Sequence, residues 1–159
     1  MLLSDKSIKR ALNDNEIRVR PDHRPEQIQP ASFDVRLGEK IYDVESDTYI
    51  TAITGTINLE PGKAYIGHTM DHVSLPNHIA AQLTGRSSVG RRGIIIHKTA
   101  GWIDPGFRGE ITLELYNFSD EVQTFEVGDR IGQLVFFKLD QSSDGYDGQY
   151  QDQTGPTHA

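Results

Sequence analysis

The sequence contains no cysteine, a single tryptophan and no apolar run long enough to span a bilayer. The lack of cysteine excludes disulfide bonds, a cysteine nucleophile and a zinc site with thiolate ligands. The first residues, MLLSDKSIKRALNDNE, turn polar after three positions, so they do not predict a secretory signal. We therefore expect a cytoplasmic protein without disulfide bonds.

The composition is that of a soluble globular domain. Of the 159 residues, 36% are hydrophobic and 25% are charged, which suits one domain with a sizeable core. The net charge of −7 argues against a duplex-DNA or other nucleic-acid polymer as the partner, because such proteins need a basic surface. A local arginine cluster can still bind phosphates, since charges more than about 8–10 Å away are screened.

The N-terminal segment predicts one short helix. Ser4 is the expected N-cap, and Ile8, Ala11 and Leu12 follow at helical spacing. We expect this helix to end within residues 13–15.

The rest of the chain predicts strands. Residues 20–32 contain three prolines and indicate an extended loop. Strand-like runs then alternate with turn signals, at 32–38, 40–44, 48–53, 64–70, 78–83, 93–97, 110–117, 122–127 and 130–139. Many short strands separated by glycine and proline are typical of an all-β barrel or sandwich.

Residues 140–159 differ in composition from the preceding strands. They are rich in Gln, Gly, Asp and Ser, and Tyr146 and Tyr150 are their only large apolar groups. Alone, such a segment should be a mobile tail. A tail of this kind can also become ordered over a ligand.

The run EITLELYN at 110–117 contains the first candidate functional residue. Ile111, Leu113 and Leu115 alternate with more polar residues, as in a strand with one face on a core. Glu114 therefore points away from the aliphatic face. The pattern alone leaves open whether Glu114 is solvated or lines a reaction site.

Two glycine-containing stretches supply further candidates. GRSSVGRRG at 85–93 offers backbone N–H groups, hydroxyls and guanidiniums, which can hold phosphate oxygens, although a basic surface turn has equal weight. It is not a P-loop, because GxxxxGK[ST] is absent. In GWIDPGFRGE at 101–110, Asp104 starts a turn signal, and Trp102 is more often a core or interface residue than a stacking platform.

The histidines give little support for a metal site. His68 and His72 are spaced as HxxxH but lack the glutamate of a zinc hydrolase, and in a strand they lie too far apart to chelate easily. The zinc-deaminase pattern, HxE followed by PCxxC, is impossible without cysteine. We expect neither a zinc ion nor another protein-bound metal.

Several stretches together resemble the dCTP deaminases, which are relatives of the trimeric dUTPases. They are GRSSVGR at 85–91, TAGWIDPGFRGEITLELYN at 99–117 and RIGQL at 130–134, with QPASFDVRLG at 29–38 and QYQDQTGPT at 149–157. The opening MLLSDKSIKRAL is also similar, and the match is loosest between about 40 and 75. The resemblance therefore extends along the whole chain.

The resemblance implies a distorted β-barrel or jelly-roll subunit in residues 1–139, with residues 140–159 as a tail that closes over the nucleotide. It implies a homotrimer with active sites shared between subunits, and no membrane partner. The implied reaction is deamination of dCTP, with Mg²⁺ bound through the triphosphate and no zinc.

By the same resemblance, Glu114 is the catalytic carboxylate. One carboxylate can take a proton from the attacking water and return it to the departing ammonia. The other matching positions imply contacts with the triphosphate (Arg86, Ser87, Ser88, Val89, Gly90, Arg91), the sugar (Asp104), the base through the backbone (Thr112, Leu113) and further parts of the nucleotide (Gln133, Tyr146, Gln153). Ser87 would also lie near the reacting base.

Gly101 and Trp102 imply the bifunctional version of the family, which continues to dUMP and diphosphate. Members that only deaminate often have a His-Arg pair at these two positions. A glycine and a missing arginine leave space for a hydrolytic water, which Asp104 would orient. The alternatives are a deaminase that stops at dUTP, a dUTP diphosphatase only, and a non-catalytic nucleotide-binding regulator; Glu114 argues against the last two.

The tail departs from the family pattern at one position. The family usually has a lysine where this chain has Gln149. We therefore expect one phosphate contact to be lost or replaced. The segment from Tyr146 to Tyr150 is also short for the family, and for this reason we expect closure of the tail over the nucleotide to be weaker.

Overall fold

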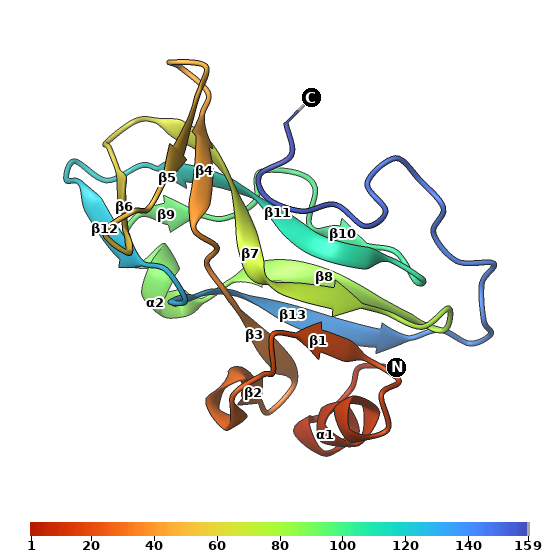
Figure 1. The fold of residues 1–159 in the computed structure, drawn as a ribbon. Helices are drawn as coiled ribbons and strands as arrows, with labels where there is room; N and C mark the ends of the chain where they lie inside the picture. Colours follow the sequence, from red (N-terminus) through yellow and green to blue (C-terminus); the bar gives the residue numbers. More distant parts are fainter. Residues whose placement is uncertain (159) are drawn as a thin grey trace.

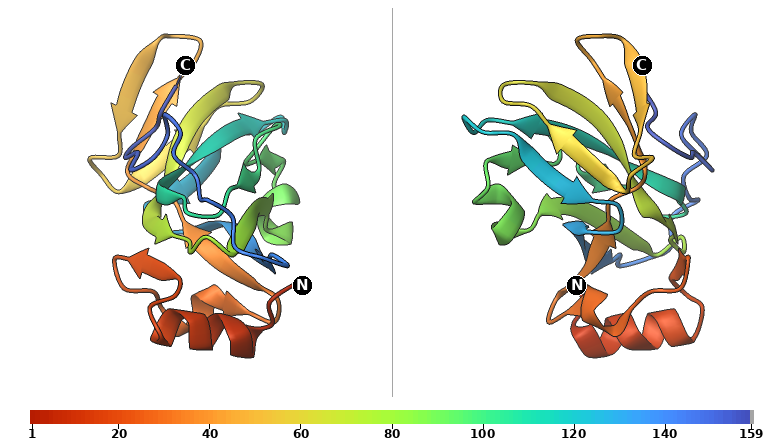
Figure 2. Two further views of the ribbon diagram at one scale, coloured as in Figure 1. Left: turned by 90° about the vertical axis from the view of Figure 1, so that its right-hand side faces the viewer. Right: turned by 60° about the vertical axis from the view of Figure 1, so that its left-hand side comes forward.

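The computed structural model describes residues 1–158, and most of its regular structure is β-strand. Helix α1, Asp5–Asn13, begins after Ser4 and buries Ile8 and Ala11, as the sequence predicts. The side chain of Ser4 makes no capping hydrogen bond, so the expected N-cap bond is absent. Helix α1 lies at one end of the molecule (Figures 1 and 2). No helix within residues 1–158 has the length and apolar character needed to cross a membrane.

The strands form three sheets. One has the order β5-β4-β7-β11-β9, with β1 also paired to β7; another has the order β10-β8-β13-β3-β2; β12 pairs with β6. Their bounds are β1 Arg18–Arg20, β2 Ile28–Gln29, β3 Ser32–Arg36, β4 Lys40–Asp43, β5 Thr48–Thr51, β6 Thr56–Leu59, β7 Ala64–Ser74, β8 Ile79–Gly85, β9 Ile94–Ile95, β10 Trp102–Ile103, β11 Arg108–Asn117, β12 Gln123–Glu126 and β13 Arg130–Lys138. The prediction of a mainly β protein with a short N-terminal helix is confirmed. Within the described residues the strands form separate sheets, not one closed barrel.

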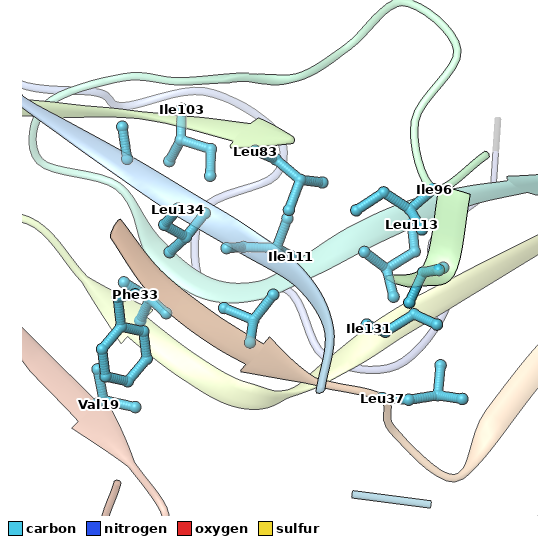
Figure 3. Packing of buried hydrophobic residues seen from close by; sticks show 14 of the residues in the cluster. Val19, Phe33, Leu37, Leu83, Ile96, Ile103, Ile111, Leu113, Ile131 and Leu134 are labelled. Atoms are coloured by element: carbon cyan, nitrogen blue, oxygen red, sulfur yellow. The ribbon is translucent and has the colours of Figure 1, made fainter. Parts of the chain in front are cut away.

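The core lies between the sheets. Ile111 and Leu113 of β11 and Leu83 and Leu134 of the facing sheet are buried and belong to one apolar cluster (Figure 3). Burying each such side chain contributes about 1.5–3 kcal/mol. Along β11, buried residues alternate with half-exposed ones. This alternation fixes the register of the strand, because a slip by one residue would expose its whole aliphatic face.

Several short elements were not predicted. Strands β1, β2, β6 and β10 have between two and four residues, and in β1 a single buried valine lies between two exposed arginines. The expected loop at 20–32 contains the 3₁₀ turn Pro25–Gln27, and the expected loop at 85–93 contains helix α2, Ser87–Gly90. Elements of this length are too short to show a hydrophobic period.

The C-terminal tail is ordered against β11, although its composition predicts mobility. The N–H of Asp152 donates to the carbonyl of Arg108 at 2.7 Å, and the N–H of Glu110 donates to the carbonyl of Gln153 at 3.0 Å. The N–H of Gly155 donates to Oε2 of Glu110 at 2.6 Å. The tail therefore lies beside the first residues of β11 and runs toward the β4–β5 hairpin (Figure 2).

Candidate functional site

Glu114 lies on the non-core face of β11 and lines a cavity. Leu113 and Leu115 on either side of it are fully buried, whereas Glu114 is half-buried. The cavity has a volume of about 630 Å³ and is bounded by β11, the turn after β10 and the tail. Its lining includes Trp102, Asp104, Thr112, Glu114, Tyr146 and Gln153. The polar face of β11 therefore borders a half-open cavity.

Backbone groups hold the Glu114 carboxylate. Its Oε2 accepts the N–H of Lys98 at 2.6 Å and the N–H of Thr99 at 3.0 Å, while Oε1 accepts neither. Burial raises the pKa of the Glu114 carboxyl, but the backbone N–H groups of Thr99, Lys98 and Ala100 and the nearby His97 outweigh it. The pKa consequently lies below its ordinary value. Glu114 is thus a carboxylate at neutral pH and is able to accept a proton.

The Gly101–Asp104 segment forms one wall of the cavity. The indole Nε1 of Trp102 donates to Oδ1 of Asp104 at 3.1 Å, which fixes the direction of that carboxylate. Gly101 is buried, and a Cβ added there would lie 2.9 Å from the carbonyl oxygen of Leu83 and 3.1 Å from Cε1 of His97. Any larger residue at position 101 would therefore displace backbone or the ring beside Glu114.

Tail residues close another side of the cavity. The ring of Tyr146 packs on Phe107 with centroids 6.1 Å apart, and its N–H donates to the carbonyl of Pro105 at 2.7 Å. Nε2 of Gln153 donates to the carbonyl of Glu110 at 2.8 Å. Oε1 of Gln153 is buried and has no hydrogen-bond partner among the described residues.

One edge of β11 is open at the cavity. The tail bonds the backbone of Arg108 and Glu110, and on the same side β9 pairs only from Tyr116 onward. By the two-residue period of a strand, the N–H and C=O of Thr112 point to this open edge, whereas those of Leu113 point to β7. Of the two expected backbone contacts, Thr112 is therefore placed for a ligand, and the side chain of Leu113 is core.

The second candidate stretch, residues 85–93, follows β8 and is called the arginine loop below. Nε of Arg86 is 3.1 Å from Oδ2 of Asp34, and its Nη1 donates to the carbonyl of Arg130 at 2.8 Å. Burial raises the pKa of Asp34 more than Arg86 and Arg130 lower it. Because Arg86 bonds Asp34 and the carbonyl of Arg130, part of its guanidinium stabilises the loop and is not free for a ligand.

The remaining residues of the loop have different surroundings. Ser87, Ser88, Gly90 and Arg91 are exposed, while Val89 is buried and anchors α2. Gln133 donates to the carbonyl of Gly85 at 3.3 Å and accepts from the hydroxyl of Ser32 at 3.1 Å, so it supports the base of the loop.

The loop and the Glu114 cavity do not meet within one chain. In the ladder between β8 and β13, Gly85 pairs with Gly132 at the end that leads to α2, and Ile79 pairs with Lys138 at the end that leads to the tail. These ends lie on opposite sides of the molecule (Figure 1). None of residues 86–91, nor Gln133, lines the cavity.

The histidine pair forms no metal centre within residues 1–158, where no cluster of three or more His, Asp or Glu side chains could hold an ion. His68 is buried, and its Nδ1 lies 2.8 Å from Oε2 of Glu110. His68 therefore supports the carboxylate to which the tail is bound.

Sequence reasoning missed the apolar wall of the cavity and the histidine beside the carboxylate. Tyr42 and Ile66 line the cavity, and Ile66 is the register partner of Glu114. His97 lowers the pKa of Glu114. A single isoleucine or histidine in a strand gives no local signal for such a wall, because lone apolar residues on a surface are common.

Comparisons with known proteins identify the family to which this chain belongs. The family model described as "dCTP deaminase-like" matches residues 2–139, and the chain belongs to this family. A protein of Kocuria rhizophila named "dCTP deaminase, dUMP-forming" is 38% identical over 179 aligned positions, covering 99% of this chain and 93% of the relative. A protein of the same name from Tropheryma whipplei strain Twist is 40% identical, covering 99% and 91%.

Solved structures agree on the fold. The 2'-deoxycytidine 5'-triphosphate deaminase of Agrobacterium tumefaciens aligns with a TM-score of 0.73 and 25% identity, covering 85% of this chain and 47% of that one. The EIAV dUTPase aligns with a TM-score of 0.55 and 20% identity, covering 84% of this chain and 98% of that one. The latter likeness concerns the fold alone.

Proposed function

We propose that this chain is a bifunctional dCTP deaminase, converting dCTP and two waters into dUMP, ammonia and diphosphate. The observation that carries the proposal is the Glu114 carboxylate, held by two backbone N–H groups on the wall of a half-open cavity. Relatives named "dCTP deaminase, dUMP-forming" that align over nearly the whole chain support it. Ammonia release from dCTP is the direct test. The nucleotide pool on which such an enzyme acts would place it in the cytoplasm.

In the proposed deamination, Glu114 moves one proton. Its free carboxylate oxygen takes a proton from the water that attacks C4 of the cytosine ring. The carboxyl then gives this proton to the amino group, which leaves as ammonia when the C4–N bond breaks. The remaining hydroxyl proton passes to N3 of the ring, so that the C4 carbonyl and the N3–H of uracil form. The lowered pKa of Glu114 keeps the group ready for the first step.

The cavity wall suggests how the nucleoside would be held. The open backbone edge at Thr112 would face the base, and the side chain of Gln153 on the cavity wall would contact the nucleotide. Asp104, oriented by Trp102, takes the sugar and later directs the water that releases diphosphate. Tyr146 and Gln153 belong to residues 140–159, which we propose as the closing tail.

The triphosphate would be bound by the arginine loop of a neighbouring subunit. Ser87 and Arg91 are exposed and distant from the Glu114 cavity of their own chain, so one chain lacks a complete site. A homotrimer of the kind implied by the resemblance would bring the two half-sites together. Mg²⁺ would enter with the triphosphate as part of the substrate.

Subunit mixing tests this arrangement. Glu114→Gln and Arg91→Ala trimers should each be impaired, but in randomly mixed trimers about a quarter of the sites would combine an intact Glu114 with an intact neighbouring Arg91. Ammonia release should therefore recover after dissociation and reassembly of the mixture. No recovery, although light scattering shows mixed trimers, would mean that each site lies within one chain.

Acid stability tests the electrostatics of Glu114. Because folding lowers its pKa, the carboxylate contributes stability above its unfolded pKa of about 4.3, and this contribution is lost as pH falls through the folded value. The difference in unfolding free energy between wild type and Glu114→Gln should thus be constant from about pH 7 to 5.5 and shift against the wild type below about pH 4.3. Urea unfolding at fixed protein concentration measures it. A shift in favour of the wild type on acidification would contradict the lowered pKa.

A further inference from the structure

A second cavity lies where β1 and β11 flank β7. Arg18 of β1 and Arg108 of β11 are both register partners of Ser74. Register partners in antiparallel strands project from the same face, and neighbouring strands are about 4.8 Å apart. Two guanidiniums therefore stand on either side of one hydroxyl.

These groups border a cavity of about 390 Å³. This volume is within the range of about 300–1,000 Å³ that is usual for small-molecule sites. Its polar lining consists of Asn15, Glu16, Arg18, Ser74, Asn77 and Arg108. Glu16 is the single acidic residue in the described lining, and its Oε1 is engaged by Nε2 of His78 at 2.7 Å. In a chain of net charge −7, this is a locally basic recess.

Both arginines keep donors for a ligand. Arg18 uses Nε for the carbonyl of Asn15 at 3.3 Å. Arg108 uses Nε and Nη2 for the two carboxylate oxygens of Asp152, each at 3.1 Å. A guanidinium has five N–H donors, so several on each side chain are uncommitted in this pattern.

We propose that this second cavity binds a small molecule bearing a phosphate group. Arg18 and Arg108 flank Ser74 in the strand register, and all three line the cavity together with Asn77. A phosphate has enough acceptor oxygens to satisfy both guanidiniums and the hydroxyl at once. This site is separate from the Glu114 cavity and from the arginine loop, and it does not depend on the proposed reaction.

A phosphate bound to the uncommitted donors of Arg108 would lie near the Asp152 carboxylate on the same guanidinium and repel it. Asp152 belongs to the tail, whose Tyr146 and Gln153 line the Glu114 cavity. Occupancy of the second cavity therefore loosens the tail, and docking of the tail weakens phosphate binding by the same factor. The recess thus links a phosphate ligand to the closure of the main cavity.

Calorimetric titration with inorganic phosphate, without nucleotide and at constant ionic strength, tests the site. Arg18→Gln should weaken phosphate binding about tenfold or more, as for the loss of one charged hydrogen-bonding partner. Arg10→Gln removes the same charge from an exposed position of α1 and should change little. Equal affinities for wild type and Arg18→Gln would overturn the proposal.

Two further comparisons locate the bound ion and its class. Asp152→Asn should strengthen phosphate binding several-fold, while Asp140→Asn, which removes an exposed carboxylate at the start of the tail, should have a much smaller effect. If binding is lost in Arg91→Gln and kept in Arg18→Gln, the phosphate sits on the arginine loop and the proposal fails. Tighter binding of malonate than of phosphate would overturn the assignment to phosphate.

Discussion

Glu114→Gln should abolish ammonia release from dCTP while leaving nucleotide binding largely intact. Glutamine keeps the size of the side chain and can still face the N–H groups of Lys98 and Thr99 through its carbonyl oxygen, but it cannot accept a proton from water. Loss of a general acid–base group lowers the rate by about 10²–10⁴-fold. Ammonia assay in single turnover, together with equilibrium binding of dCTP, separates the two effects.

Glu126→Gln is the matched control for this experiment. Glu126 is an exposed carboxylate on β12, so its replacement changes the net charge equally without touching the cavity. Its ammonia release should equal that of the wild type. Unchanged ammonia release in Glu114→Gln would remove this carboxylate from the mechanism.

Wild-type protein given dCTP and Mg²⁺ should yield dUMP and diphosphate, and Asp104→Asn should make dUTP accumulate. The Asp104 carboxylate lies in the turn between β10 and β11 and is oriented by Trp102. We expect it to align a water for attack on the phosphate chain. Asparagine keeps an oxygen for the indole N–H but is a much weaker base. We expect the diphosphatase step to fall by about 10²-fold or more, with deamination less affected.

Chromatographic separation of dUTP from dUMP after incubation with dCTP, and separately with dUTP, measures the two steps. Asp120→Asn, which removes an exposed carboxylate from the loop after β11, serves as the control and should give the wild-type product. Accumulation of dUTP by the wild type would instead make the protein a deaminase that stops at dUTP. Conversion of dUTP without any conversion of dCTP would indicate a dUTP diphosphatase.

Much of the fold could be predicted because the longer strands have a strong period. In β11, the buried Ile111, Leu113 and Leu115 recur at every second position, and this pattern identified both the strand and its free face. Strands β1 and β10 have three and two residues, too few for a period, and their pairing depends on β7 and β8 far along the chain. Such long-range partners leave no local signal.

The candidate site could be predicted only in part, because some of its contacts join segments that are far apart in the sequence. Glu114, Asp104 and Thr112 lie around one cavity because they share a short segment of chain. The tail was expected to be mobile from its composition, yet its order comes from individual bonds, such as that between Gly155 and Glu110, which composition does not reveal. The separation of α2 from Glu114 arises from the length of the β8–β13 ladder, a property of the assembled sheet.

The anchoring of Glu114 also bears on how this protein tolerates sequence change. The groups that hold its carboxylate are main-chain amides at positions 98 and 99, which exist whatever side chains those positions carry. Substitutions at Lys98 or Thr99 can therefore change the surface of the loop and still leave both N–H hydrogen bonds to Glu114 in place. Proline has no amide hydrogen, so it is the one replacement that would remove the hydrogen bond from its position to Glu114.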